Sequence, residues 1–141
     1  MAVYTTKLFD KKLKSEILSD SYLCEIANEV MHGRFEGDLG GGVLKKRIAL
    51  NAGKSAGART IIFFKLGSNL FFADGWKKNQ VRKGVKEIQD DELAVYKDIA
   101  GDLLQLTVQQ IARLVKVKEL REVECDGCKD ERTAGNGEKP A

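Results

Sequence analysis

The chain has 141 residues, 43% of them hydrophobic and 32% charged, so it can bury the core of one domain. No apolar run is long enough to span a membrane and the first residues lack the apolar core of a secretory signal, which predicts a cytoplasmic protein with no membrane association. The net charge is +3, but the charges are unevenly distributed along the chain, because Val43–Lys86 holds eleven Lys and Arg residues and one acid, Asp74.

The N-terminal part predicts a short strand followed by two helices. Ala2–Tyr4 is typical of a strand, and the apolar spacing in Lys7–Leu18 predicts a helix with one buried face. Ser19 or Asp20 can cap a second helix that ends near Gly33. The apolar face of that helix comprises Leu23, Ile26, Ala27, Val30 and Met31. The triplet Gly40–Gly42 is expected to interrupt regular structure.

Three extended segments follow, at Val43–Leu50, Arg59–Leu66 and Asn69–Trp76. They are rich in β-branched and aromatic residues, and short connections favour antiparallel neighbours, with Gly67–Asn69 as a hairpin loop. Their aromatic residues are expected mostly in the core, with alternate rings on opposite faces of the sheet: Phe63, Phe64, Phe71 and Phe72.

The C-terminal part predicts two helices and a polar tail. Acidic residues in the first turn favour a helix beginning near Asp90, and Thr107 can cap a further helix. Residues 1–123 are predicted to form one domain, and 124–141 a polar, disordered tail. The predicted fold class is α+β: a small antiparallel sheet of three to four strands, two N-terminal helices packed on it, and one or two C-terminal helices.

The three cysteines give a weak chemical signal. Cys24 lies in an apolar helical pattern and is expected to be a buried thiol. Cys125 and Cys128 form one C-x-x-C pair, which supplies only two of the four ligands of a structural zinc site. A reducible pair without a structural role is therefore favoured over metal or redox chemistry, with zinc shared between two chains as the open alternative.

Familiar phosphate-binding and hydrolytic motifs are incomplete. A P-loop needs a glycine five residues before Gly53, where the chain has Ile48. The only histidine, His32, falls at a predicted helix end and suits a cap or surface residue better than a catalytic base. Asp74 alone cannot form a metal nuclease site, and Glu36 and Asp38 could join it only through tertiary folding. The sequence therefore predicts no metal and no cofactor.

The remaining candidate is a site made of cations. An antiparallel sheet brings the end of the first extended segment, the start of the second and the end of the third to related edges. Lys45 and Arg47 are expected on one face and Lys46 on the other. Clustered cations bind phosphate and can lower a lysine pKa enough to supply a neutral base, while Arg can stabilise charge developing on a phosphate. RNA would supply its own 2′-hydroxyl nucleophile, without a metal.

Three stretches of the chain resemble the RelE/HigB-type toxins of bacterial type II toxin–antitoxin systems: Leu44–Ala49, Gly53–Ile61 and Phe72–Asn79. The order of the predicted elements is similar too, over roughly Val3 to Val123. The resemblance implies a metal-independent endoribonuclease that cuts messenger RNA on the ribosome. It also implies a cognate antitoxin, with a helix-turn-helix protein as the expected type.

The resemblance also implies roles for single residues. The catalytic or phosphate-contacting candidates are Arg47, Lys54, Arg59 and Lys78, with Arg59 as the first choice for transition-state stabilisation and Lys46 or Lys54 for proton transfer. The RNA-binding candidates are Lys45, Lys46, Trp76, Lys77 and Asn79. Three alternatives stay open: Arg59 anchors a strand to an acidic helix, Trp76 is buried rather than stacked on a base, and Asn79 caps the next segment. Two other functional classes stay open, a non-catalytic or degenerate nucleic-acid binder and a gyrase-poisoning ParE-like effector.

Overall fold

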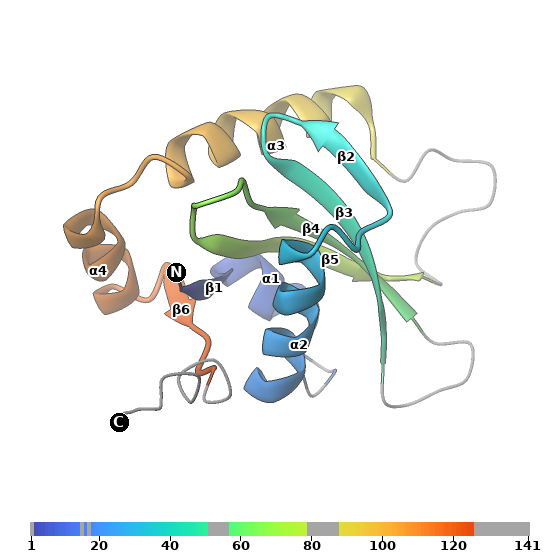
Figure 1. Cartoon of the computed structure of the whole chain (residues 1–141), viewed down its shortest axis with the longest axis horizontal. Coiled ribbons are helices and arrows are strands. Elements are labelled where there is room, and N and C mark those ends of the chain that lie inside the picture. Colours follow the sequence, from blue (N-terminus) through green and yellow to red (C-terminus); the bar gives the residue numbers. More distant parts are fainter. Residues whose placement is uncertain (1, 15, 17, 51–56, 79–87, 126–141) are drawn as a thin grey trace.

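The computed structural model of the chain describes residues 2–14, 16, 18–50, 57–78 and 88–125. Within these ranges the chain forms a six-stranded sheet and four helices (Figure 1). The elements, in chain order, are β1 (Val3–Thr6), α1 (Lys7–Lys12), α2 (Asp20–Met31), β2 (Gly37–Gly40), β3 (Val43–Ala49), β4 (Gly57–Phe63), β5 (Leu70–Lys77), α3 (Asp90–Leu103), α4 (Val108–Lys116) and β6 (Leu120–Glu122).

The strands form one mixed sheet in the order β2-β3-β4-β5-β1-β6. The antiparallel arrangement predicted for β3, β4 and β5 is confirmed. However, β1 lies parallel to β5, with Val3 opposite Leu70, and β6 pairs antiparallel with β1. The prediction of an antiparallel sheet of three to four strands is therefore wrong, since the described residues form a mixed sheet of six. The two ends of the chain supply strands whose pairing is non-local, so no short-range pattern predicted it.

Strand β2 was also not predicted, because its sequence is rich in glycine, which has a low strand propensity. The expected interruption at Gly40–Gly42 is the turn between β2 and β3. All three glycines have positive φ, at 93°, 64° and 86°. Residues with a Cβ rarely adopt this conformation, so the glycines allow the chain to reverse and begin β3.

Helices cover both faces of the sheet. The predicted N-terminal helices, α1 and α2, pack on one face, whereas α3 and α4 contribute to a second core on the other face. The first core includes Phe9, Leu13, Leu23, Ile26, Leu44, Ile48, Phe64 and Phe72. The second core includes Tyr4, Val43, Ile61, Phe63, Phe71, Tyr96, Ala100 and Ile111. Adjacent phenylalanines thus face opposite cores, as the strand alternation predicted.

Capping side chains mark the helix starts. The Ser19 hydroxyl accepts a hydrogen bond from the Tyr22 N–H, so Ser19 rather than Asp20 caps α2. The predicted Thr107 cap of α4 is confirmed, in a reciprocal capping box. Helix α1 ends at Lys12 and not at Leu18, because the chain turns at Leu13, whose side chain enters the first core.

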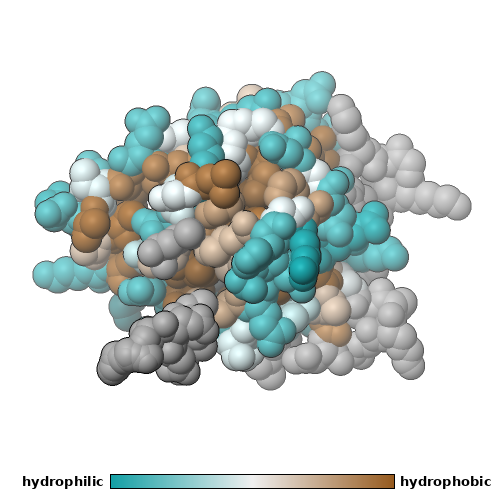
Figure 2. Space-filling model, in the orientation of Figure 1, coloured by the Kyte–Doolittle hydropathy of each residue, from teal (hydrophilic) through white to brown (hydrophobic). Residues whose placement is uncertain are grey.

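An apolar groove lies between the C-terminal end of α2 and the strands that follow it. Its apolar lining includes Val30, Met31, Phe35, Leu44 and Phe64. These residues belong to the first core or pack against it. Figure 2 shows that apolar side chains also reach the surface between α4 and the β4–β5 turn, while polar side chains gather near the end of α2.

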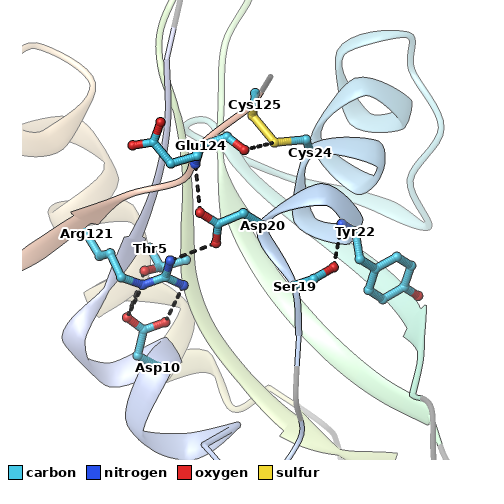
Figure 3. A network of polar contacts seen from close by, with 9 residues as sticks. All are labelled: Thr5, Asp10, Ser19, Asp20, Tyr22, Cys24, Arg121, Glu124 and Cys125. Atoms are coloured by element: carbon cyan, nitrogen blue, oxygen red, sulfur yellow. Dashed lines mark hydrogen bonds and ion pairs between the residues drawn. A yellow bond between two sulfur atoms is a disulfide. The ribbon is translucent and has the colours of Figure 1, made fainter. Parts of the chain in front are cut away.

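The C-terminal end of the described chain is tied to α2. Cys24 forms a disulfide with Cys125, so the predicted free thiol at Cys24 is wrong. The bond joins residues 101 positions apart, a separation that gives no local sequence signal. Cys128 and most of the predicted 124–141 tail lie outside the described residues. Glu124 and Cys125, the first two residues of that segment, are held against α2 by the contacts in Figure 3.

Candidate functional site

Two of the predicted catalytic residues, Arg47 and Arg59, are directly opposite each other on β3 and β4. Trp76 is opposite Arg59 on β5. Residues in register across an antiparallel sheet share a face, with Cβ atoms roughly 5 Å apart. The three side chains therefore form one line across the meander, here named the Arg47–Arg59–Trp76 row. It lies on the face that carries the second core, since Trp76 packs against that core.

The row is partly open to solvent. Arg47 is exposed, and Arg59 and Trp76 are half-buried. The backbone N–H of Arg47 donates to Oε1 of Glu36 at 2.7 Å, which fixes the end of β3 next to the row. Arg59 interacts with other groups of the protein as well. The row therefore combines two guanidinium groups with one aromatic ring on a defined backbone.

The neighbouring row contains the acid of the basic segment. Lys45, Ile61 and Asp74 are in register across β3, β4 and β5, on the same face as the arginines. Lys45 is half-buried and interacts with another group of the protein. The prediction that Lys45 and Arg47 share a face is confirmed, because both pair with β4 residues directed toward the second core.

Asp74 is a buried junction between three elements. It is 4% exposed, and its Oδ2 accepts a hydrogen bond from the Tyr96 hydroxyl of α3 at 2.6 Å. Its Oδ1 lies 3.0 Å from Nζ of Lys12 and accepts a bond from the Gly75 N–H at 2.7 Å. Burial and the bond to Asp74 raise the pKa of Tyr96, so the phenol stays protonated and donates. The acid therefore joins α1 and α3 to β5.

This junction also reaches the tryptophan of the row. The Lys12 ammonium lies 5.7 Å from the centroid of the Trp76 ring, within the range of a cation–π contact. The Trp76 indole Nε1 is buried and has no hydrogen-bond partner among the described residues. The sequence analysis did not identify Lys12 or Tyr96. The presence of one acid among eleven Lys and Arg residues was nevertheless a signal that Asp74 has a structural role.

Lys46 is separated from the arginines by the sheet. It is opposite Thr60, on the face of the first core, and only 8% exposed. Its ammonium forms an ion pair with Glu29 of α2 at 2.9 Å. The expected opposite orientation of Lys46 and Arg47 is therefore confirmed, and Lys46 connects β3 to α2.

Lys77 is likewise on the opposite face, because it pairs in register with Ala58 of the first core. Its ammonium lies 2.8 Å from Oε2 of Glu16. Lys78, the next residue, is exposed where β5 ends. Lys54 and Asn79 lie outside the described residues. Gly53–Ser55, the P-loop-like segment, connects one strand to another, β3 to β4, as the sequence predicted.

Helix α2 supports the end of β3 by a contact that the sequence did not indicate. The Tyr22 hydroxyl donates to the Ala49 carbonyl at 2.8 Å and accepts from the Ala49 N–H at 3.1 Å. Tyr22 thereby satisfies both backbone groups of the last residue of β3. His32, by contrast, is at the C-cap of α2, with Nδ1 2.7 Å from the Asn28 carbonyl, as expected of a capping residue.

In the described parts of the chain, no group of three or more carboxylate, histidine or cysteine side chains is placed to hold a metal ion. No helix in these parts is both long enough and apolar enough to cross a membrane.

Comparison with known families gives one match. A family model described as the RelE toxin of the RelE/RelB toxin–antitoxin system matches residues 1–123. The match includes β1 through β6 and therefore every strand that forms or flanks the Arg47–Arg59–Trp76 row. The search of curated proteins found no match.

Proposed function

Because the chain belongs to the RelE toxin family, we propose that it is a metal-independent endoribonuclease that cleaves messenger RNA on the translating ribosome. Membership makes the chain a toxin of a toxin–antitoxin system and implies a cognate antitoxin as its partner. The observation that carries the proposal is the Arg47–Arg59–Trp76 row, where two guanidinium groups and an aromatic ring share one face.

The side chains of the row are suited to bind a phosphate group of RNA and a neighbouring base. Guanidinium groups bind phosphate oxygens through paired hydrogen bonds, and aromatic rings stack on bases of single-stranded RNA. In this proposal Arg47 binds a phosphate next to the scissile one, and Trp76 stacks on a base. Lys45, on the same face, adds a positive charge beside the row. These contacts would place the phosphodiester bond that is cleaved next to Arg59.

Cleavage then uses the RNA's own hydroxyl group. The 2′-oxygen attacks the adjacent phosphorus, the bond between phosphorus and the 5′-oxygen breaks, and a 2′,3′-cyclic phosphate and a 5′-hydroxyl result. The 2′-hydroxyl loses one proton, and the departing 5′-oxygen gains one. Arg59 stabilises the charge that develops on the phosphate oxygens. Removing one preorganised donor of this kind lowers the rate of catalysis by a factor of about 10²–10³.

The lysines divide into two groups in this mechanism. Lys46 and Lys77 are ion-paired with Glu29 and Glu16 on the opposite face, which favours supporting roles for them. We therefore assign proton transfer to Lys54 and phosphate contact to Lys78. Lys54 belongs to the segment between β3 and β4, the strands that carry the two arginines. Asn79 follows Lys78 and is assigned a hydrogen bond to RNA.

Induced expression in a bacterium tests the activity directly. Growth arrest with transcripts cut at codon-related positions is the expected result. Arrest with DNA damage and intact transcripts would instead identify a gyrase-poisoning effector. Absence of any effect at verified protein levels would identify a non-catalytic or degenerate binder.

A short RNA, incubated with a high concentration of purified protein and no ribosomes, tests the chemistry. Cleavage should continue in EDTA and leave a 2′,3′-cyclic phosphate. Activity that is lost in EDTA and restored by Mg²⁺ would contradict the metal-free mechanism. The partner is tested by co-expression with the neighbouring reading frame, for which we propose a helix-turn-helix antitoxin that restores growth.

A further inference from the structure

Strand β1 covers only part of the edge of β5. It pairs in parallel with β5 as far as Thr5, which is opposite Phe72. The Thr6 hydroxyl then donates to the Ala73 carbonyl at 2.7 Å, and the chain continues into α1. The edge of β5 after Ala73 therefore lies next to a helix rather than a strand.

The close packing of α1 on β5 depends on Gly75. A Cβ at this position would lie 2.9 Å from Cδ1 of Leu13 and 3.4 Å from Cε1 of Phe9. Carbon atoms prefer a separation of roughly 3.5–4.0 Å, so the missing side chain allows this contact. Phe9 and Leu13 belong to the first core. Lys12 of the same helix therefore reaches Asp74, on the other face of the sheet, past the edge of β5.

A β-bulge in β5 determines the face on which Asp74 and Trp76 lie. Adjacent residues of β4 pair with Phe72 and Asp74, so Ala73 is an extra residue in β5. One extra residue reverses the alternation of the side chains that follow it. Without it, Asp74 would share the face of Phe72, which belongs to the first core. The bulge therefore directs Asp74 and Trp76 to the face of the Arg47–Arg59–Trp76 row.

The Lys12 ammonium contacts both of these side chains. Its Nζ lies 3.0 Å from Oδ1 of Asp74 and 5.7 Å from the centroid of the Trp76 ring. The Lys12 side chain is 41% exposed, whereas that of Asp74 is 6% exposed. The carboxylate is itself fixed by hydrogen bonds from the Tyr96 hydroxyl and the Gly75 N–H. Asp74 therefore holds the ammonium group at a defined place over the ring.

The orientation of the Trp76 ring depends on packing and on this cation. The ring packs against the second core and is half-buried. Its indole Nε1 has no hydrogen-bond partner among the residues that the structure describes. The ammonium of Lys12 is attracted to the π-electrons of the ring and lies over one of its faces. The surface of the ring that Lys12 does not cover is the part on which a base can stack.

We propose that Lys12 is a positioning residue for Trp76, which sets the tilt of the ring so that a base of RNA stacks on its open surface. The inference rests on the proposed function, because that function assigns Trp76 to a base of the RNA. Lys12 acts through the ring and not by its own contact with RNA, since its ammonium is held by Asp74.

RNA binding by the full-length chain tests the proposal, with Trp76, the only tryptophan, as the fluorophore. The probe is a short RNA whose 2′-hydroxyl groups are methylated, so that it is not cleaved. Wild type should bind it with quenching of the Trp76 emission. Lys12→Met, which keeps the length of the side chain and removes its charge, should bind about fivefold more weakly, with less quenching. Its emission spectrum without RNA should also shift, whereas Lys12→Arg should stay close to wild type.

Two further variants control for charge and for folding. Lys11→Met removes an exposed charge at the neighbouring position of α1 and should bind within about twofold of wild type, because solvent screens that charge. Lys12→Met combined with Asp74→Asn leaves no unpaired charge in the core and keeps the net charge of wild type. It should bind as weakly as Lys12→Met, and it keeps the test available if the single variant does not fold.

A double-mutant cycle separates positioning from direct contact. In a Trp76→Leu background, Lys12→Met should have no further effect on RNA affinity, because the ring on which Lys12 acts is absent. An equal loss in both backgrounds would show that Lys12 attracts or contacts RNA itself, and would overturn the proposal. Wild-type affinity and quenching in Lys12→Met would overturn it too. A wild-type chain that does not bind RNA would instead contradict the proposed function, and this inference with it.

Discussion

Charged side chains are concentrated in two regions of the molecule, and they are arranged differently in each. In the C-terminal network, defined by Asp10, Asp20, Arg121 and Glu124, Arg121 lies between the carboxylates of Asp10 and Asp20 and bonds to both. In the Arg47–Arg59–Trp76 row, two arginines lie directly opposite each other. The acid of that basic segment, Asp74, is turned to Tyr96 and Lys12.

The two regions differ in which charges face each other: opposite charges in the C-terminal network and like charges in the row. Like charges directly opposite each other on a sheet are destabilising, whereas an arginine with paired carboxylates is held in a fixed geometry. The ion pairs of the C-terminal network therefore stabilise the fold. In the row, two like charges lie at paired positions of the sheet, an arrangement that a polyanionic ligand would stabilise.

The largest expected effect is on activity, at the row. Arg59→Ala should lower the rate of RNA cleavage by a factor of about 10²–10³, because it removes the group assigned to the developing phosphate charge. Its melting temperature should stay close to that of wild type. Single-turnover cleavage and thermal unfolding of the same preparation measure both.

Arg113→Ala is the matched control, because Arg113 is an exposed arginine on α4, outside the row. It should retain wild-type cleavage. Equal loss in both variants would mean that total charge, rather than the position of Arg59, sustains activity. Full cleavage by Arg59→Ala at equal protein concentration would remove Arg59 from the site.

The main strands and helices were predictable because their signals are local. β-Branched and aromatic residues identified β3, β4 and β5, and Thr107 identified the start of α4. The parallel pairing of β1 with β5 and the short edge strand β6 depend on contacts between distant parts of the chain. The Cys24–Cys125 bond depends on the same closure of the two ends, so no spacing rule could find it.

The candidate site was predictable only as far as strand register determines it. Antiparallel pairing and side-chain alternation were enough to bring Arg47 toward Arg59 and to separate Lys46 from both. The Lys46–Glu29 and Lys77–Glu16 pairs depend on where the helical residues pack, which a strand pattern does not contain. The catalytic and RNA-binding roles of the site residues stay predictions.

The second expected effect is at the buried junction beside the row. Tyr96→Phe removes the 2.6 Å hydrogen bond to Asp74 and keeps the ring, so the free energy of unfolding should fall by about 1.5–3 kcal/mol, the range for bonds to charged groups. Trp76 is the only tryptophan, so its fluorescence should report any change at the row. Denaturant unfolding and emission spectra measure these effects.

Tyr4→Phe is the control for this substitution, since Tyr4 belongs to the same second core but does not bond to Asp74. It should leave the emission spectrum unchanged. If Tyr96→Phe behaves like Tyr4→Phe, the junction does not contribute to the geometry around Trp76.

A smaller effect is expected in the C-terminal network. Arg121→Ala should lower the free energy of unfolding by about 1 kcal/mol, because the Arg121 side chain is 44% exposed and solvent screens its ion pairs. RNA cleavage should be unchanged. Arg121→Lys, which keeps the charge but loses the planar fork, should fall between wild type and Ala. A cleavage defect in Arg121→Ala would show that the two charged regions are coupled.

The smallest effect is the acid sensitivity of the same network. Burial acts to raise the pKa of Asp20, but hydrogen bonds from the Glu124 N–H and from Arg121 outweigh it, so the pKa lies below its ordinary value. A carboxylate with a lowered pKa stabilises the fold above its unfolded pKa of about 3.9 and loses that contribution as the pH falls through its folded value. Denaturant unfolding should therefore show Asp20→Asn less stable than wild type at pH 7, by less than about 1 kcal/mol, with the difference shrinking below about pH 4. Glu25→Gln, an exposed position on the same helix outside the network, should show no such convergence. A constant difference for Asp20→Asn at every pH would indicate that the side-chain charge contributes nothing and that the loss comes from packing alone.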